Sequence, residues 1–202
     1  MYAPQPIITL LDTPADILSL EVIKEFIGLD PDIDAEQDKV LPVLRRAVID
    51  DGEQITGVVW AAATYSIEGL CIAWPGASFR LPLTPAFAVA EVTGKDGTGL
   101  EVSVPSTAYR FIPSAINLGR PWGTLRPYSS WPEQALAFTI TCTAGWTADT
   151  LPDSLRAWAL NRIATLYDYR EDLVTGTITA AMPRHHTNGL LDRWTVRGTP
   201  DG

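Results

Sequence analysis

The sequence predicts an α+β protein with a small helical core of about three to four helices, an inserted antiparallel β region and an extended C-terminal arm. Apolar residues recur at three- and four-residue steps near both ends of the chain, alternate with polar residues in the middle, and are punctuated there by turn residues. We expect one domain over residues 1–202, with the helical core in 14–60 and 150–171, the β insertion in 63–146 and the arm in 172–202.

The composition is that of a folded chain with its own hydrophobic core. Of its 202 residues, 46% are hydrophobic and 19% charged, unlike the low-hydrophobicity, high-charge profile of disordered chains. The formal net charge of -9 argues against sequence-independent nucleic-acid binding, which needs a cationic surface. Apolar runs such as 58–63 are far shorter than the roughly 20 residues of a membrane span. We therefore expect no membrane association and, with no signal-peptide pattern visible, a cytoplasmic origin.

An extended lead-in over residues 1–13 is expected to precede a short first helix. Ser19 is a good N-cap and Gly28 a good left-handed stop after the last turn. The core-facing stripe of this helix is expected to be Leu20, Ile23 and Ile27.

A second helix is expected within about 34–58, beginning near Asp38. Pro42 is tolerated only in a first turn, and Gly52 weakens a helix interior, so a bend near Asp51-Gly52 is expected.

The middle of the chain, from about 63 to 143, is predicted to be β structure. The strand-like runs are 66–72, 87–93, 100–104 and 137–143. The second and third are expected to pair as a hairpin across 94–99, with Asp96-Gly97 supplying positive φ. Residues 117–134, rich in Pro and Gly, are predicted to form a long loop.

The third helix is predicted to begin at Thr150-Leu151-Pro152-Asp153, which has the pattern of a capping box with Pro in the first turn. It is expected to continue to about Tyr169. Its core face would consist of Leu155, Trp158, Ala159, Ile163 and Leu166.

No motif in the sequence predicts catalysis, a cofactor or a metal ion. The glycines of 94–99 lack the Lys-Ser/Thr ending of a phosphate-binding loop. Asp30, Asp32 and Asp34 imitate the start of a calcium loop, but the later positions that need Gly and Glu hold other residues, so a solvated acidic segment is expected.

The histidines and cysteines also favour structural roles. His185 and His186 are adjacent, which does not place both on one helix face as a zinc motif requires. Cys71 and Cys142 stand in strand-like runs without metal-ligand spacing, so two reduced, buried thiols are expected.

Seven tryptophans could fill a core or line a binding groove. Trp158 lies on the apolar stripe of the third helix and is expected in the core, whereas Trp60, Trp74 and Trp146 flank elements and are expected to seal their edges. Trp194 stands with Leu190 and Leu191 on an otherwise polar arm. Two interpretations of this group stay open: it folds back on the domain, or it anchors in a partner.

The order of these segments resembles the head-tail connector (adaptor, head-completion) family of tailed phages, including relatives in gene transfer agents. The resemblance covers nearly the full chain. It is carried by Ser19–Lys24, Ile55–Gly57, Phe79–Pro85, Val92–Val104, Tyr109–Phe111, Trp131-Pro132, Phe138–Trp146, Leu151–Arg156, Tyr167–Glu171 and Gly189–Trp194. The sequence departs from the family pattern at Pro42 and Gly52 and in a longer loop over 117–130.

This resemblance implies a non-enzymatic virion protein that works by assembly. Such proteins form a cyclic ring, usually a dodecamer, that docks below the portal protein and meets a tail-ward stopper or tail terminator component. DNA only passes through the channel, and the particle is assembled in the cytoplasm of the bacterial host. Leu190, Leu191 and Trp194 are the expected portal-binding residues. The alternative is a β-rich carbohydrate- or peptide-binding module; an enzyme of unknown type has the least support.

Overall fold

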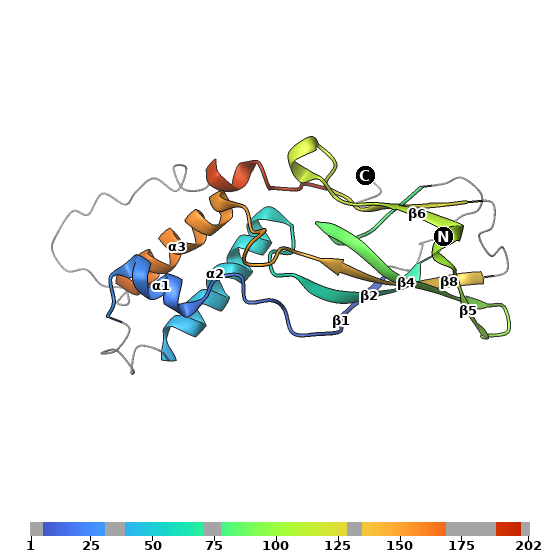
Figure 1. Ribbon diagram of the computed structural model, residues 1–202, viewed down its shortest axis with the longest axis horizontal. Coiled ribbons are helices and arrows are strands. Elements are labelled where there is room, and N and C mark those ends of the chain that lie inside the picture. Colours follow the sequence, from blue (N-terminus) through green and yellow to red (C-terminus); the bar gives the residue numbers. More distant parts are fainter. Residues whose placement is uncertain (1–5, 31–38, 71–77, 129–134, 169–188, 199–202) are drawn as a thin grey trace.

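The structure, a computed structural model, describes residues 6–30, 39–70, 78–128, 135–168 and 189–198. The molecule is elongated, with three α-helices at one end and two antiparallel sheets at the other (Figure 1). The predicted α+β fold class is confirmed. None of the described helices is both long enough and apolar enough to span a lipid bilayer.

Helix α1 (Leu20–Ile27) has the two ends that the sequence predicts. The hydroxyl of Ser19 accepts a hydrogen bond from the Val22 N–H, and Gly28 adopts the left-handed conformation with φ of 73°. The stripe residue Ile23 is fully buried, and Leu20 and Ile27 pack beside it. Local sequence therefore fixes both the length and the orientation of this helix.

Helix α2 (Leu41–Thr56) begins three residues later than expected, with Pro42 in its first turn and Gly57 after its end. It runs through Gly52 as one element. The glycine is there for packing: a Cβ at this position would lie 2.5 Å from ring atoms of Trp60. The tryptophan ring occupies the space that any side chain at position 52 would need.

Helix α3 (Asp153–Asp168) buries the predicted face, with Leu155, Trp158, Ala159 and Ile163 in the core and Leu166 packed against it. The predicted capping box is wrong. The hydroxyl of Thr150 accepts from the Thr147 N–H, and the first helical hydrogen bonds go to the Pro152 carbonyl. Thr150 thus closes a turn before the helix.

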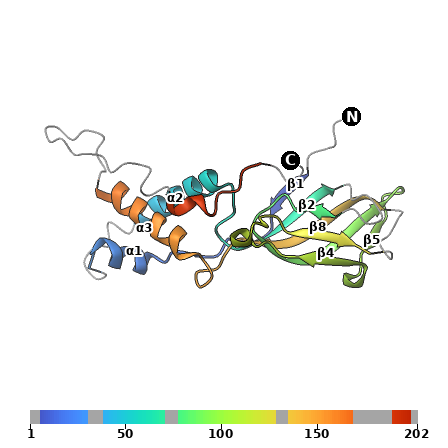
Figure 2. The same cartoon turned by 90° about the horizontal axis from the view of Figure 1, so that it is seen from above.

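The larger sheet has five antiparallel strands in the order β1-β2-β8-β4-β5 (Figure 2). Their bounds are Ile7–Leu10, Ala63–Leu70, Ala135–Ala144, Ala86–Asp96 and Glu101–Ser103. The strands predicted at 87–93, 100–104 and 137–143 are confirmed, as is the run 66–72 up to Leu70, after which it lies outside the described residues. Strand β8 is the central one. The lead-in was not predicted as a strand, yet Ile7–Leu10 pairs with β2 at the edge of the sheet.

The β4–β5 hairpin forms as predicted, but its turn is tighter. Strand β4 continues to Asp96, and the positive φ of 85° is at Gly99, whereas Gly97 has no positive φ. The Asp96 carboxylate accepts hydrogen bonds from the N–H groups of Thr98 and Leu100. The Thr98 hydroxyl donates to the same carboxylate at 2.6 Å, and this bond, together with the two from backbone N–H groups, lowers the pKa of Asp96.

A smaller three-stranded sheet covers one face of the larger one. Its strand order is β3-β7-β6, with bounds Phe79–Arg80, Thr124–Pro127 and Tyr109–Ile112. Two 3-10 turns, Ser106–Ala108 and Ile116–Leu118, flank β6. Strand β7 falls within residues 117–134, so the prediction of one long loop there is wrong over this part.

Two groups of buried residues form the interior. One lies among the three helices and includes Ile17, Leu18, Ile23, Leu41, Val48, Leu155, Ile163 and Leu191. The other lies between the two sheets and includes Ile67, Leu81, Ala86, Val92, Leu125, Phe138, Ile140 and Cys142. Trp60 and Trp146 connect the helical end of the molecule with the sheet end, because the backbone N–H of Trp146 donates a hydrogen bond to the Trp60 carbonyl at 2.7 Å.

Candidate functional site: assembly surfaces

A tryptophan cluster fills the junction between helices and sheets. Trp60 is fully buried, and its ring meets that of Trp158 edge to face at 5.7 Å between centroids. Its indole N–H donates to the Thr56 hydroxyl at 3.0 Å, and that hydroxyl donates to the Gly52 carbonyl. The polar atom of the buried ring is therefore satisfied within α2.

Glu53 supports the same junction from α2. Its carboxylate accepts the backbone N–H of Trp60 at 2.6 Å. Burial raises the pKa of Glu53, although that hydrogen bond opposes the rise. The carboxylate serves a structural contact here, since its described partner is the backbone.

The C-terminal segment 189–198 packs on this junction and begins with a helical turn at 189–192. The Trp194 ring meets that of Trp146 edge to face at 5.7 Å, and its indole N–H donates to the Ser154 hydroxyl at 2.8 Å. The Val196 N–H donates to the Thr56 carbonyl at 2.7 Å. Of the two interpretations left open for this group, folding back on the domain is the one the structure shows.

The three residues expected to bind the portal come together on the helical end. Leu191 is only 1% exposed and belongs to the helical core, while Leu190 and Trp194 are half-buried against it. The sequence did not indicate the partners of Trp194, which are the Ser154 hydroxyl and the Trp146 ring. No local pattern signals a contact between residues 40 or more positions apart.

Strand β1 presents a second surface, because among the described residues it pairs with β2 alone, at the edge of the five-stranded sheet. All four of its residues are exposed, and large apolar side chains stand exposed at Ile7, Ile8, Leu10 and the following Leu11. An apolar strand at an open sheet edge is typical of an interaction surface, because its backbone groups and side chains are both available for pairing.

A pocket of about 390 Å³ opens beside the three-stranded sheet, lined by Arg80, Arg120, Trp122 and Thr124 with Ile112, Pro113, Gly119 and Pro121. Among the residues that the structure describes, those with a shifted pKa are Asp12, Glu53, Tyr65, Asp96, Tyr109 and Cys142, and none of them lines this pocket. The pocket thus carries cationic and aromatic groups without a tuned acid or base.

The candidate metal and thiol residues are only partly described. Asp30 is exposed, and Asp32, Asp34, Cys71, His185 and His186 lie outside the described residues. Within the described ranges, no three His, Cys, Asp or Glu side chains gather as metal ligands would. Cys142 is a free thiol, fully buried as predicted, and burial raises its pKa to about 11.

Most described tryptophans serve the interior. Trp60, Trp146 and Trp158 are buried, and Trp122 and Trp194 are half-buried. Trp74 and Trp131 lie outside the described residues. Four of the five described tryptophans, Trp60, Trp146, Trp158 and Trp194, therefore pack at the junction, and Trp122 lines the pocket.

Comparison with known proteins finds solved structures with a similar fold. No family model and no curated protein matches the chain. Three similar solved structures are a neck of an empty gene transfer agent particle with C6 symmetry (22% identity, TM-score 0.72), a virion of a native particle (21%, 0.72) and a neck of a native particle with C12 symmetry (24%, 0.65). Each likeness covers 95% of this chain and 97% of the other. The chain therefore shares its fold, over nearly its whole length, with chains of gene transfer agent particles.

Proposed function

We propose that this chain is a non-enzymatic structural protein of a phage or phage-like gene transfer particle, acting as a head-tail connector subunit. The observation that carries the proposal is the fold likeness to chains in particle necks, which spans 95% of this chain and 97% of theirs. Near-equal coverage of both chains indicates the same architecture throughout, including the inserted sheets.

The proposed mechanism is mechanical. Copies of the chain form a cyclic ring, a dodecamer in the expected arrangement, and the C6 and C12 symmetries of the similar necks support a ring of this kind. The ring binds the portal protein on one side and a stopper or tail terminator on the other, and DNA passes through its channel. Assembly takes place in the host bacterial cytoplasm. The exposed apolar edge of β1 adds a surface suited to such contacts.

We expect the subunit to consist of a helical core (14–60 and 150–171), a β insertion (63–146) and a C-terminal arm (172–202). We expect Leu190, Leu191 and Trp194 to form its portal-binding group. Because Leu191 is buried, we expect Leu190 and Trp194 to offer their half-exposed sides to the portal while Leu191 holds the segment in place.

The test is negative-stain electron microscopy of the purified chain, alone and mixed with the portal protein of the same particle. Rings, or portal rings that gain a collar, are expected; a chain that ignores the portal would refute the connector role. Truncation after Gly189 is expected to abolish portal binding. Since truncation also removes the buried Leu191, the folding of the truncated chain is checked by circular dichroism. Arg197→Glu, which alters an exposed side chain of the same segment, is the control and should bind the portal normally.

A further inference from the structure

The outer face of the three-stranded sheet is cationic in an otherwise acidic protein. The sequence has no Asp or Glu from 69 to 90 or from 102 to 128, although it carries 24 acids against 15 Lys and Arg overall. Within these stretches the structure exposes four arginines: Arg80, Arg110, Arg120 and Arg126. This segregation of charge singles out the sheet as a binding surface.

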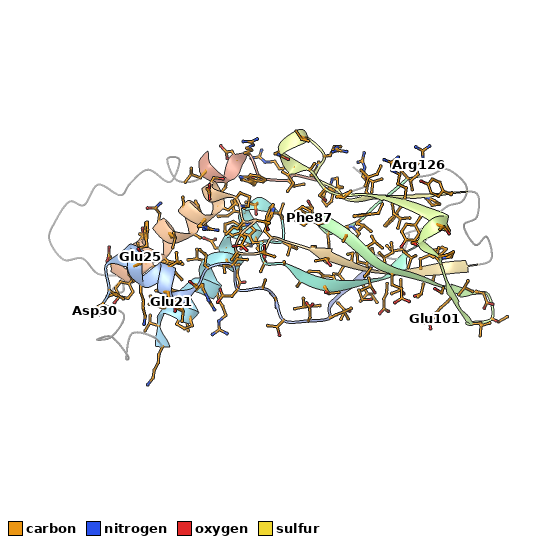
Figure 3. The ribbon with its side chains drawn as sticks, in the orientation of Figure 1. Glu21, Glu25, Asp30, Phe87, Glu101 and Arg126 are labelled. Atoms are coloured by element: carbon orange, nitrogen blue, oxygen red, sulfur yellow. The ribbon has the colours of Figure 1, made fainter. Side chains whose placement is uncertain are left out.

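Strand pairing fixes the direction of the arginine side chains. Leu125 of β7 is fully buried, and its cross-strand partners Phe79 and Phe111 pack into the same interior. Because side chains alternate along a strand, the paired residues Arg110 and Arg126 project from the opposite, outer face. Figure 3 shows Arg126 on that outward side.

This arrangement is unfavourable unless an acidic group lies nearby. Directly opposed residues in an antiparallel pair have Cβ atoms about 5 Å apart, and like charges there destabilise the sheet. Arg110 and Arg126 are such a pair. Carboxylates placed over them would form charge-assisted hydrogen bonds, which are strongest with the planar guanidinium group.

A complementary surface lies on α1. Glu21 and Glu25 are one helical turn apart and exposed, and Val22 and Phe26 beside them are 40% and 47% exposed. The acidic residue Asp30 follows the helix end. Exposed apolar side chains also lie next to the strands that carry the arginines: Leu118, 70% exposed, in the 3-10 turn after β6, and Tyr128, 45% exposed, directly after β7. Both charge and apolar content therefore match.

The two surfaces lie at opposite ends of the elongated molecule: Glu21 and Glu25 at the helical end and Arg126 at the sheet end (Figure 3). They cannot meet within one chain. We propose that the arginine face of one copy, centred on Arg110 and Arg126, binds the α1 face of a second copy of this chain, centred on Glu21 and Glu25. Contacts between two different surfaces are head-to-tail, and repeated they close into a ring. This inference rests on the proposed function, for which it names the contact between subunits.

A nucleic-acid backbone would also attract arginines, but the charge distribution favours a protein partner. A duplex lying on this small face would extend over the remainder of a chain whose net charge is -9. The α1 face instead matches the sheet region in charge and in its exposed apolar residues. Duplex DNA bound by the arginine face would overturn the proposal.

The experiment uses two full-length variants, each with one face reversed. Arg110→Glu/Arg126→Glu alters the sheet face, and Glu21→Arg/Glu25→Arg alters α1. Each is expected to lower the yield of rings about tenfold or more, because reversal sets like charges against each other. Combining all four changes is expected to restore the rings. The matched controls are Arg46→Glu/Arg197→Glu and Glu68→Arg/Asp149→Arg, which reverse exposed charges outside both faces and should form rings normally.

Mixing the two variants tests the contact without the portal. The first variant then has two acidic faces and the second has two basic faces, so the mixture should form assemblies that contain equal numbers of the two variants by native mass spectrometry, while neither variant associates alone. Circular dichroism verifies that every variant is folded.

The outcomes separate this contact from the connector role. If wild-type rings form and each variant joins them as well as the wild type does, the contact is overturned and the connector role stands. The same holds if the variant with all four substitutions fails to restore rings. If the wild type forms no ring and no portal collar but the variants still pair, the contact stands alone. Absence of these mixed assemblies overturns the contact. The contact is also overturned if Arg110→Glu/Arg126→Glu loses duplex DNA binding that the wild type shows but still assembles as the wild type does.

Discussion

Trp146 and Trp194 meet edge to face with 5.7 Å between their ring centroids, although they lie 48 positions apart in the sequence. Trp146 follows the central strand of the larger sheet, and Trp194 belongs to the C-terminal segment. Their contact therefore ties the chain end to the place where helices and sheets join.

Replacing Trp194 by Ala is expected to lower the free energy of unfolding by about 2–3 kcal/mol, because it removes the ring contact and the hydrogen bond to Ser154. Trp194→Phe keeps an aromatic ring without the indole N–H and should cost about 1 kcal/mol. Urea unfolding followed by circular dichroism measures both. Equal stability of the wild type and the alanine variant would show that the segment is not held by this ring.

Gly52→Ala is expected to destabilise the protein by about 1–3 kcal/mol, even though Ala improves helix propensity by roughly 1 kcal/mol. The new Cβ would lie 2.5 Å from ring atoms of the fully buried Trp60, which has no room to move aside. Thermal unfolding of this variant is compared with that of Gly189→Ala, where nothing lies within 4 Å of the added methyl. A Gly52→Ala protein as stable as wild type would refute the packing role of this glycine.

The elements with strong local signals were predictable. Ser19 and Gly28 set the ends of α1, and the alternation in 137–143 gave the central strand β8. The elements that were missed depend on tertiary pairing. Strand β1 consists of four exposed residues with no alternation, and it is a strand because β2 offers an edge. Asp12 adds to this docking by accepting the Thr64 N–H, which lowers its pKa.

The candidate site shows the same division. The sequence indicated that Leu190, Leu191 and Trp194 form one apolar group, and the structure brings them together. It gave no means of finding Ser154 or Trp146 as their partners. The arginine face was also hidden, because Arg80, Arg110 and Arg126 become neighbours only when β3, β6 and β7 pair. A net charge summed over the chain masks such a local surplus.

Cys142 is expected to resist thiol reagents in the folded protein. It is fully buried and its pKa is raised to about 11, so only about a thousandth of the thiol is ionised at pH 8. Reaction of a Cys71→Ser protein with an aromatic disulfide reagent should be slow in buffer and fast in urea. The less stable Trp194→Ala form should react faster than its parent. Rapid reaction in buffer would mean that strand β8 opens readily.

Glu53 makes the stability depend on pH in a predictable direction. Burial raises its pKa above the ordinary value of 4.5, so the folded protein holds a proton that the unfolded chain has already released. The free energy of unfolding contributed by this group is therefore full below pH 4.5 and falls as the pH rises through the folded pKa. Glu53→Gln keeps an oxygen acceptor for the Trp60 N–H but has no proton to lose.

The wild type should consequently lose stability relative to Glu53→Gln as the pH rises above the ordinary pKa of 4.5, measured by urea unfolding at each pH. Asp12 and Asp96, whose pKa values are lowered, act in the opposite direction, but they are present in both proteins and cancel in the difference. A difference that stays flat would show that the carboxyl group is as well solvated in the folded protein as in the unfolded chain. A difference that moves in favour of the wild type as the pH rises would show that the Trp60 hydrogen bond outweighs burial.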